Sequence, residues 1–465
     1  MVHIYNAAAE ICSFVNRACG DDSLFVRYSC ITAAARRNIM SDIRKRLPLL
    51  FEPYEDAGEP VIHCIKKHEP TEEFYNALDD CITELEAAGE LFRLIGLAQV
   101  LDGAMRDILQ EKIDELQEDD FSVVLNSNRE RTGVGLLPRC SCVWERKHRL
   151  SQSSNCMDNF LCNILLLENT ILGELIDKHY FLKDDFFSGF AQHKRLRIAA
   201  TPLRREANLE VELYERDSVQ YFRVRRAEGG CGPENEAVWQ KIVKAAKENS
   251  DIVVFPEMLG NEETARYISA RLKELDADER KNFPAMIILP SVWSRNMNTV
   301  TILNREGSIL CRQSKQNPFR VEFDGTGYLE GIRPNMVVNI FHHEGIGRIA
   351  VLICKDFLTT KYMEQLMRCF KLTLIIVPSY STGSYDFRQS FDLCAHDDCN
   401  VVWINTCAAL RNGKESNFEN IGYVRKRIGR SDDDSQKLCR MPICRGAFSG
   451  ECSHDCIFFE DIKGV

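Results

Sequence analysis

The sequence predicts an α/β protein with two parts: a mostly helical segment over residues 1–190 and a layered sheet-and-helix domain over residues 195–465. In the second part, short apolar runs that end in a polar residue alternate with amphipathic stretches, which is the pattern of strands connected by helices. In the first part, apolar residues recur at spacings of three and four, as they do on one face of a helix.

The overall composition is that of an ordinary globular protein. The chain has 465 residues, of which 45% are hydrophobic and 28% charged, and its formal net charge is −10. We therefore expect no nucleic-acid binding through global charge. We read no run of about 18 apolar residues, which a membrane span needs, and no secretory signal at the start of the chain. The twenty cysteines are then expected to be reduced thiols of a cytoplasmic protein.

The first part contains no motif that carries chemistry. Its helical periodicity is clearest from residue 72 onward, where Phe74, Leu78, Ile82 and Leu85 fall on one face. We expect a further buried helix over residues 163–177 and a loop over residues 127–158. The basic cluster from Arg36-Arg37 to Arg44-Lys45-Arg46 could contact phosphates, but a solvated helix face is the preferred interpretation. The role of this helical domain is unknown, and an interaction or oligomerisation module is the simplest hypothesis.

The second part is predicted element by element. A mixed sheet is expected, because strands alternate with helices and a hairpin interrupts the alternation. The predicted strands lie over residues 196–202, 251–257, 285–293, 348–354, 372–379 and 400–405. A hairpin spans 298–313, residues 211–224 are a candidate for an irregular hairpin, and the helices span 234–249, 262–275, 359–370 and 386–397.

Three polar residues stand just after predicted strands: Glu257, Lys315 and Cys354. Ligands of open α/β sheets bind beyond the carboxyl ends of strands, so these side chains are candidates for one site. A thiol attacks as the thiolate and needs a base, which Glu257 can supply. Lys315 can stabilise an oxyanion, as can the amide of Lys355. We expect Lys315 and the helix after Cys354 to favour the thiolate. The alternative is that Cys354 is simply a small buried hydrophobe.

The flanking sequences strengthen the first interpretation, because they resemble the nitrilase superfamily of carbon–nitrogen hydrolases over residues 195–410. Asp251-Ile252-Val253-Val254-Phe255-Pro256-Glu257 is similar to that family's general-base segment. Asn298-Thr299-Val300-Thr301-Ile302-Leu303, followed by Lys315, is similar to its lysine segment. Gly347-Arg348-Ile349-Ala350-Val351-Leu352-Ile353-Cys354-Lys355-Asp356 is similar to its nucleophile segment, and Ile375-Ile376-Val377-Pro378-Ser379 to the strand that follows.

The resemblance implies an α-β-β-α sandwich, hydrolysis of a non-peptide amide-type bond through a cysteine acyl-enzyme, no cofactor or metal, and a homo-oligomer. It assigns the triad to Glu257, Lys315 and Cys354. Many relatives carry a second active-site glutamate, for which Glu322 is the first candidate and Glu330 the runner-up. Ser379 and Tyr380 are expected to line the substrate pocket. The substrate itself is not indicated.

Two other functions stay open at this point. The acyl group could pass to an amine, or the domain could be a sensor or scaffold that works with a protein partner, for example in bacterial defence, through the helical part. The sequence also departs from the family. Lys355 stands where relatives often have an aromatic or acidic residue, and the closing strands beyond Cys407 are not recognisable. The tail residues Cys452, His454 and Cys456 are expected to be thiols and a histidine without metal.

Overall fold

The computed structural model describes residues 2–19, 23–56, 59–117, 123–145, 156–203, 209–226, 232–396, 398–409, 420–427, 436–444, 446 and 455–463. The chain forms two compact units. The first comprises residues 1–141, 146–173 and 368–370, and the second comprises residues 142–145, 174–367 and 371–465. Each unit is described separately.

The first unit is built around α5 (Leu91–Ala104), which is buried on most sides and contributes seven hydrophobic residues to the core. Such a helix needs neighbours all round, and three of the other helices, α1, α3 and α4, pack against it. The remaining elements of this unit are α1 (Val2–Ala18), α2 (Ser23–Ser29), α3 (Ala33–Arg46), η1 (Pro48–Leu50), α4 (Glu72–Ala87), α6 (Arg106–Leu116), α7 (Arg129–Thr132), η3 (Met157–Phe160), α8 (Asn169–Leu172), and the paired strands β1 (Phe51–Asp56) with β2 (Glu59–Ile62) and β3 (Val134–Pro138) with β4 (Ile164–Glu168).

Two sequence predictions for this region are wrong. Residues 163–177 do not form a helix, because Ile164–Glu168 is a strand that pairs with Val134–Pro138. A short apolar run can be a strand or a helix segment, and periodicity alone does not separate the two. The boundary near residue 190 is also placed too late. Strand β5 (Ile176–Phe181) pairs in parallel with β16 (Val337–His343) through six residue pairs, so it belongs to the second unit.

The second unit contains two seven-stranded sheets. The first has the order β11-β12-β10-β9-β6-β22, with β13 also paired to β12; its strands are β6 (Arg195–Ala200), β9 (Ile252–Val254), β10 (Met286–Ile288), β11 (Val292–Ser294), β12 (Met297–Asn304), β13 (Ile309–Ser314) and β22 (Phe458–Lys463). The second has the order β21-β20-β19-β18-β17-β16-β5; its other strands are β17 (Gly347–Val351), β18 (Leu374–Pro378), β19 (Asn400–Ile404), β20 (Asn420–Arg427) and β21 (Gln436–Pro442).

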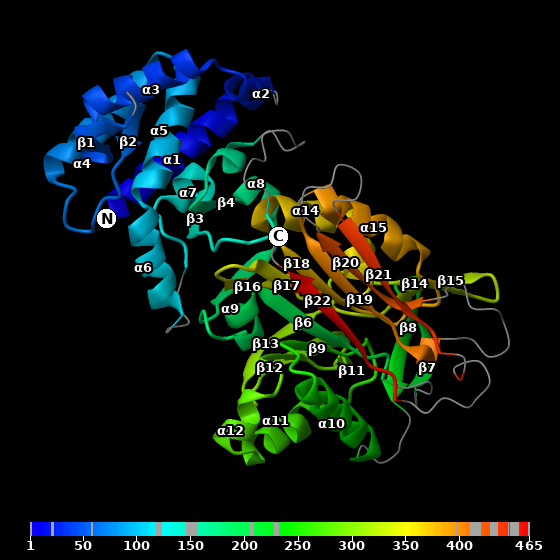
Figure 1. The fold of residues 1–465 in the computed structure, drawn as a ribbon. Coiled ribbons are helices and arrows are strands. Elements are labelled where there is room, and N and C mark those ends of the chain that lie inside the picture. The colour runs from blue at the N-terminus through cyan, green and yellow to red at the C-terminus, as the bar shows by residue number, and fades with distance from the viewer. Residues whose placement is uncertain are drawn as a thin grey trace. The chain divides into compact units, whose positions relative to one another are not determined.

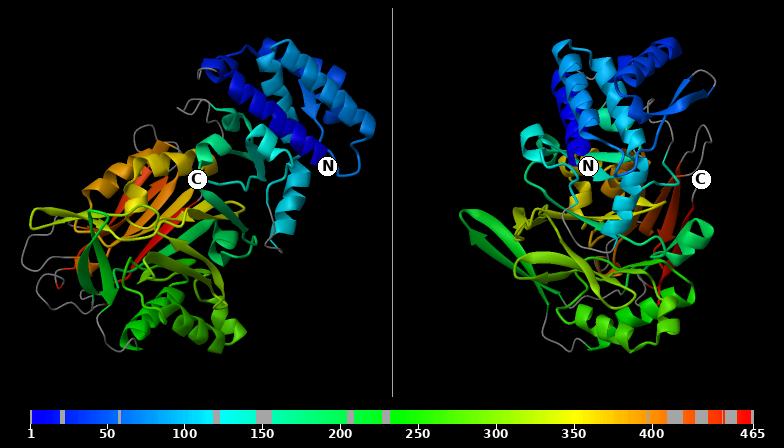
Figure 2. Two further views of the ribbon diagram at one scale, coloured as in Figure 1. Left: turned by 180° about the vertical axis from the view of Figure 1, so that it is seen from behind. Right: turned by 90° about the vertical axis from the view of Figure 1, so that its left-hand side faces the viewer.

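Helices cover the outer faces of these two sheets, so the second unit is an α-β-β-α sandwich (Figure 1, Figure 2). On the first sheet, α10 (Gly232–Lys247) and α11 (Thr264–Glu274) bury Trp239, Ile242 and Leu272 against the apolar side chains of β9 and β10. The other helices of the unit are α9 (Ser188–His193), α12 (Ala277–Lys281), α13 (Lys355–Leu358), α14 (Thr360–Phe370), α15 (Tyr385–His396) and η4 (Cys407–Ala409). A four-stranded sheet, β14 (Arg320–Phe323), β15 (Thr326–Glu330), β8 (Val219–Arg226) and β7 (Leu209–Arg216), completes it.

The closing strands that the sequence did not reveal are present. β20 and β21 extend the second sheet beyond β19, and β22 pairs antiparallel with β6 in the first. Asn420–Arg427 and Gln436–Pro442 are therefore strands, although the sequence shows no recognisable strand pattern there. Residues 410–419 and 428–435 lie outside the described chain, as do Cys452 and His454.

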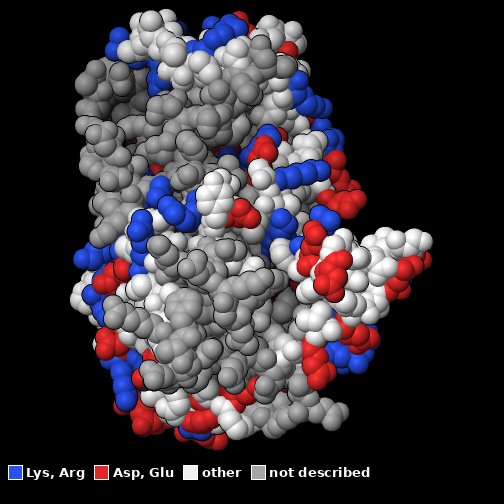
Figure 3. All heavy atoms as spheres, turned by 90° about the vertical axis from the view of Figure 1, so that its right-hand side faces the viewer, with Lys and Arg blue, Asp and Glu red and all other residues white. Residues whose placement is uncertain are grey.

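Three further findings concern the surface charge, the helices and the side chains that could bind a metal. On the face drawn in Figure 3, Lys and Arg alternate with Asp and Glu over the described residues, and neither sign forms a continuous field. None of the described helices combines the length and the apolar character that crossing a bilayer requires. The described Cys, His, Asp and Glu side chains include no group of three placed to hold a metal ion.

Candidate active site

The candidate site lies where strands of both sheets end. Glu257 follows β9 and Lys315 follows β13 in the first sheet, while Cys354 follows β17 in the second. All three side chains are buried. A hydrogen bond connects the two sheets at the site: the backbone N–H of Glu257 donates to the carbonyl of Ser379 at 3.3 Å. Ser379 follows β18 of the second sheet.

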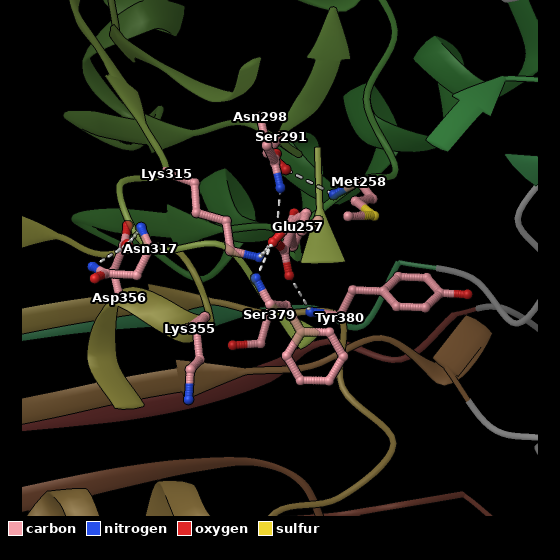
Figure 4. A network of polar contacts seen from close by, with 12 residues as sticks. Glu257, Met258, Ser291, Asn298, Lys315, Asn317, Lys355, Asp356, Ser379 and Tyr380 are labelled. Carbon is pink, nitrogen blue, oxygen red and sulfur yellow. Dashed lines mark hydrogen bonds and ion pairs between the residues drawn. The ribbon is translucent and has the colours of Figure 1, made fainter. Parts of the chain in front are cut away.

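Glu257 is held by donors on both carboxylate oxygens (Figure 4). Its Oε1 accepts hydrogen bonds from Asn298 Nδ2 at 2.7 Å and from Lys315 Nζ at 2.9 Å. Its Oε2 accepts from the backbone N–H of Tyr380 at 2.8 Å. Asn298 begins the hairpin that ends at Lys315, and its carbonyl also accepts from the Lys315 backbone N–H at 2.9 Å. Asn298 was not predicted as a site residue. The only sequence feature that marks it is its polar side chain at the start of an apolar strand.

Lys315 is a buried ammonium between two carboxylates. Besides Glu257, its Nζ contacts Glu330 Oε2 at 2.8 Å. Burial opposes the charge of Lys315, but Glu257 and Glu330 outweigh burial and hold the pKa of Lys315 well above its usual value. The lysine is therefore a permanent cation at neutral pH.

Of the two candidates for a second glutamate, the structure brings Glu330, the runner-up, to Lys315 and leaves Glu322 away from it. Glu322 lies in β14, opposite Gly327, with its side chain exposed. Glu330 ends β15, the other arm of the same hairpin, and its Oε2 also accepts from the backbone N–H of Phe319 at 2.7 Å. Because the chain reverses in this hairpin, Glu330 lies next to Lys315 although Glu322 is closer to it in sequence. Burial, the largest influence, raises the pKa of Glu330 against the opposing effect of Lys315.

Cys354 occupies a strained backbone position. Its φ is 47°, a value that residues with a side chain rarely adopt. Two hydrogen bonds hold this conformation: the Cys354 N–H donates to the Pro378 carbonyl at 3.0 Å, and the Cys354 carbonyl accepts from the Phe357 N–H at 3.1 Å. The strained turn places the thiol between the end of β17 and the start of α13.

The environment of Cys354 favours the protonated thiol. Burial, the largest influence, and the nearby carboxylate of Glu257 raise the pKa of Cys354 against the opposing effects of Lys315 and the Tyr380 amide. Lys315 does favour the thiolate, as expected, but the burial, which the sequence does not reveal, outweighs it. Glu257 is the carboxylate available to receive the thiol proton.

Asp356 joins the nucleophile segment to the lysine segment. Its fully buried carboxylate accepts from the backbone N–H of Gln316 at 2.9 Å and of Asn317 at 2.7 Å, and from Asn317 Nδ2 at 2.9 Å. Burial raises the pKa of Asp356 to about 6 against these donors. Because Gln316 follows Lys315 directly, Asp356 sets the distance between Lys315 and Cys354.

The remaining predicted site residues contribute through their backbones. Lys355 opens α13, so its N–H belongs to the first turn, whose amides have no partner within the helix; its side chain points away from Glu257 (Figure 4). Ser379 is fully buried, and its hydroxyl accepts from Trp403 Nε1 at 3.0 Å. The Tyr380 hydroxyl donates to the Ala408 carbonyl at 3.0 Å, while its amide serves Glu257.

No protein-family model matches the chain, and no curated protein matches it. Among solved structures, the chain is similar to the C. elegans NitFhit protein, with 15% identity over 58% of this chain and 61% of that chain and a TM-score of 0.36. It is similar to Saccharomyces cerevisiae Nit3, a member of branch 10 of the nitrilase superfamily, with 12% identity over 58% of this chain and 90% of that chain and a TM-score of 0.35. An amidase from Nesterenkonia sp. has 13% identity over 49% of this chain and 81% of that chain, with a TM-score of 0.30. The chain thus spans less than two thirds of NitFhit, and over about half its own length it is similar to solved structures that include a nitrilase-superfamily protein.

Proposed function

We propose that this protein is a nitrilase-superfamily hydrolase that cleaves a non-peptide, amide-type carbon–nitrogen bond through an acyl-enzyme on Cys354. The observation that carries the proposal is the buried Lys315 ammonium, which contacts Glu257 at 2.9 Å and Glu330 at 2.8 Å beside a thiol on a strained turn. A cation, a base and a nucleophile in one buried site are the groups that acyl transfer needs.

In the first half of the reaction, Glu257 takes the proton of the Cys354 thiol as the sulfur attacks the substrate carbonyl carbon. The negative charge that develops on the carbonyl oxygen is stabilised by the Lys315 ammonium and the Lys355 N–H. When the tetrahedral intermediate collapses, the carbon–nitrogen bond breaks and Glu257 returns its proton to the leaving amine. The products of this half are a free amine and a thioester on Cys354.

In the second half, water hydrolyses the thioester. Glu257, again a carboxylate, takes a proton from the attacking water, and the same two donors stabilise the second oxyanion. Collapse breaks the carbon–sulfur bond, the sulfur regains the proton, and a carboxylic acid leaves. The sum is one amide and one water converted into one acid and one amine, with no redox change.

The two carboxylates have different tasks in this proposal. Glu257 accepts hydrogen bonds from Asn298, Lys315 and the Tyr380 amide. Glu330 contacts Lys315 and the Phe319 amide. We assign proton transfer to Glu257 and the positioning of Lys315 to Glu330.

The test is turnover of a panel of short aliphatic and aromatic amides, followed as released ammonia, together with the intact mass of the protein during turnover. We expect an acyl adduct on Cys354 and no ammonia from Cys354→Ala. The matched control is Cys394→Ala, which removes another fully buried thiol, in α15, and should leave turnover unchanged. Equal rates for wild type and Cys354→Ala would contradict the proposal.

The same assay separates the two other functions considered. If the acyl-enzyme forms but passes its acyl group mainly to an amine, added hydroxylamine should capture it as a hydroxamate at the expense of the acid. If the domain is a sensor or scaffold, neither an adduct nor ammonia should appear with any amide of the panel.

A further inference from the structure

The first unit contains a pocket that the proposed hydrolysis does not use. Its volume is about 600 Å³, within the range of small-molecule sites. Helices α3 and α5, strand β2 and the segment around Phe160 supply its walls. The lining residues are Tyr28, Ala33, Arg36, Arg37, Met40, Pro60, Ile62, Cys64, Gln99, Asp102, Gly103, Arg106, Phe160, Cys162 and Asn163.

The floor of this pocket is pre-formed by hydrogen bonds. The Tyr28 hydroxyl donates to Gln99 Oε1 at 2.7 Å, and Gln99 Nε2 donates to the Phe160 carbonyl at 3.3 Å. The rings of Tyr28 and Phe160 meet edge to face, with centroids 5.3 Å apart. Side chains that are locked to one another keep a pocket open without a ligand, which lowers the free-energy cost of binding.

Asp102 fixes the opposite side of the floor. Its buried carboxylate accepts from the backbone N–H groups of Cys162 at 2.8 Å, Asn163 at 3.0 Å and Ile164 at 2.8 Å. The Asp102 carboxylate is therefore satisfied by backbone donors of the segment that follows Phe160. The charge at the rim of the pocket comes from other side chains. Gly103 allows the close approach of β2, since a Cβ there would lie 3.1 Å from Ile62 Cδ1.

The rim is cationic. Arg36 and Arg37 extend from the first half of α3, Arg106 begins α6, and all three have exposed side chains. Arg106 forms an ion pair with its neighbour Asp107, at 3.2 Å on the surface. Arg36 lies near enough to Tyr28 to oppose the rise in the phenol's pKa. Three guanidinium groups line the rim against the Asp102 carboxylate of the lining and the Asp107 partner of Arg106, so the excess of positive charge favours anions. Guanidinium groups bind phosphate in a bidentate manner.

The wall between the rim and the floor is apolar, because Met40, Ile62, Cys64 and Phe160 line the pocket there. A simple oxyanion would not fill about 600 Å³ or use this wall. We propose that this pocket binds a nucleotide, with its phosphates on Arg36, Arg37 and Arg106 and its base between the apolar wall and the Tyr28–Phe160 floor. The first unit is then a nucleotide-responsive module, a role that does not depend on the hydrolase activity of the second.

The test is calorimetric titration of the full chain with ATP, with AMP, with tripolyphosphate and with adenosine. We expect ATP to bind at least tenfold more tightly than tripolyphosphate or adenosine, because it alone supplies both the phosphates and the base. Arg36→Gln should weaken ATP binding by about tenfold, the loss expected for a charge-assisted hydrogen bond. The matched control is Lys45→Gln, which removes an exposed cation from the same helix outside the pocket and should leave ATP binding unchanged.

A second variant tests the base site separately. Met40→Trp fills part of the apolar wall and leaves the three arginines intact, so it should weaken ATP and AMP binding but not the weak binding of tripolyphosphate. Circular dichroism of each variant checks that the helical unit is folded. Equal affinity for tripolyphosphate and ATP, no binding of any nucleotide, or an equal effect of Arg36→Gln and Lys45→Gln would each overturn the proposal. None of these outcomes bears on amide hydrolysis, which is measured without nucleotide.

Discussion

At the scale of single residues, burial has the largest effect on the protonation of the Cys354 thiol. Burial, and after it the carboxylate of Glu257, raises the pKa of the thiol, and the opposing effect of Lys315 is smaller. A carbonyl oxygen that becomes negative during attack would face Lys315, whose charge both glutamates sustain. The site is therefore arranged for charge that appears during the reaction and not for charge in the resting thiol.

We predict that Glu330→Gln lowers kcat/KM on the order of 10²-fold, the size of effect that follows the loss of one oxyanion donor. Glutamine keeps the shape but removes the charge that holds the Lys315 ammonium in place. Steady-state hydrolysis of the best amide measures this. Glu322→Gln, in the same hairpin but exposed, is the control and should change kcat/KM by less than about twofold.

We predict that Cys354 reacts slowly with iodoacetamide between pH 7 and pH 9, more slowly than the exposed Cys30. The thiolate is the reactive form. The folded protein raises the pKa of Cys354 above that of a free thiol. The thiolate fraction of Cys354 therefore stays small even at a pH equal to the pKa of a free thiol. Peptide mass mapping after limited labelling gives both rates. Early labelling of Cys354 at pH 7 would mean that the buried carboxylate does not control the thiol.

The same raised pKa has a consequence for stability, with a definite sign. The protonated thiol is favoured in the folded state, so its contribution is fully present below the pKa of the unfolded thiol, about 8.5, and falls as the pH rises above it. Cys311, whose pKa burial raises to about 12, acts in the same direction.

Glu257, Lys315 and Cys354 could be proposed from the sequence because Glu257 and Cys354 come at the ends of predicted apolar strands and Lys315 comes after a predicted hairpin. It ranked Glu322 above Glu330 because distance along the chain was the only available guide. The segment from Gln316 to Gly331 has no periodicity, so the hairpin that reverses this order was invisible. Asn298 and Asp356 were missed as site residues for a related reason: their importance depends on hydrogen bonds between elements that are distant in sequence.

At the scale of elements, the candidate site depends on how two loops are joined. The loop after β13 carries Lys315 and the loop after β17 carries Cys354, and each comes from a different sheet. Asp356 connects them through three hydrogen bonds to Gln316 and Asn317. A buried carboxylate with several donors is a rigid connection, because removing it leaves each donor unsatisfied.

We predict that Asp356→Ala lowers the free energy of unfolding by about 2–4 kcal/mol, since it leaves buried N–H groups unpaired. It should also lower kcat more than it raises KM, because the distance between Lys315 and Cys354 is no longer fixed. Urea unfolding and steady-state kinetics measure the two effects. Asp386→Ala, an exposed aspartate in α15, is the control. Normal kcat in a destabilised Asp356→Ala protein would limit Asp356 to a structural role.

The regular elements of the second unit were largely predictable, and the irregular ones were not. Strands such as Leu374–Pro378 and Asn400–Ile404 are fully buried and apolar, so composition alone identifies them. Strand β20 contains Lys426 and Arg427 among its last residues and does not show an apolar run over its whole length. Its identity as a strand comes from its pairing with β19 and β21, which no local pattern reveals.

At the scale of the whole molecule, residues 142–145 belong to the second unit although most of the preceding chain belongs to the first. The Trp144 indole is buried and donates to the Thr373 carbonyl at 3.2 Å. Glu145 forms an ion pair with Arg348, a fully buried residue of β17. A boundary near residue 190 cannot separate the units, because the counter-ion of Arg348 lies far before it.

We predict that Glu145→Ala destabilises the protein by about 3–5 kcal/mol, because it leaves a buried guanidinium without its carboxylate. The Lys371 carbonyl, which accepts from Arg348 Nη2 at 2.8 Å, does not neutralise that charge. Thermal and urea unfolding measure the effect. Glu274→Ala, an exposed acidic residue of α11, is the control and should be within about 0.5 kcal/mol of wild type. An equal, small effect of both substitutions would mean that Arg348 is neutralised elsewhere.

The position of residues 142–145 also constrains the order of events during synthesis. The ribosome makes Trp144 and Glu145 long before it makes Thr373 and Arg348, their respective partners in the second unit. At 5–20 residues per second, the interval of roughly 200 residues lasts about 10–40 s. During that time most of the first unit has been made and can fold, while Trp144 and Glu145 have been made without their partners in the second unit. The nascent chain therefore exposes this short segment to chaperones, and a pause in translation before residue 345 would prolong the exposure.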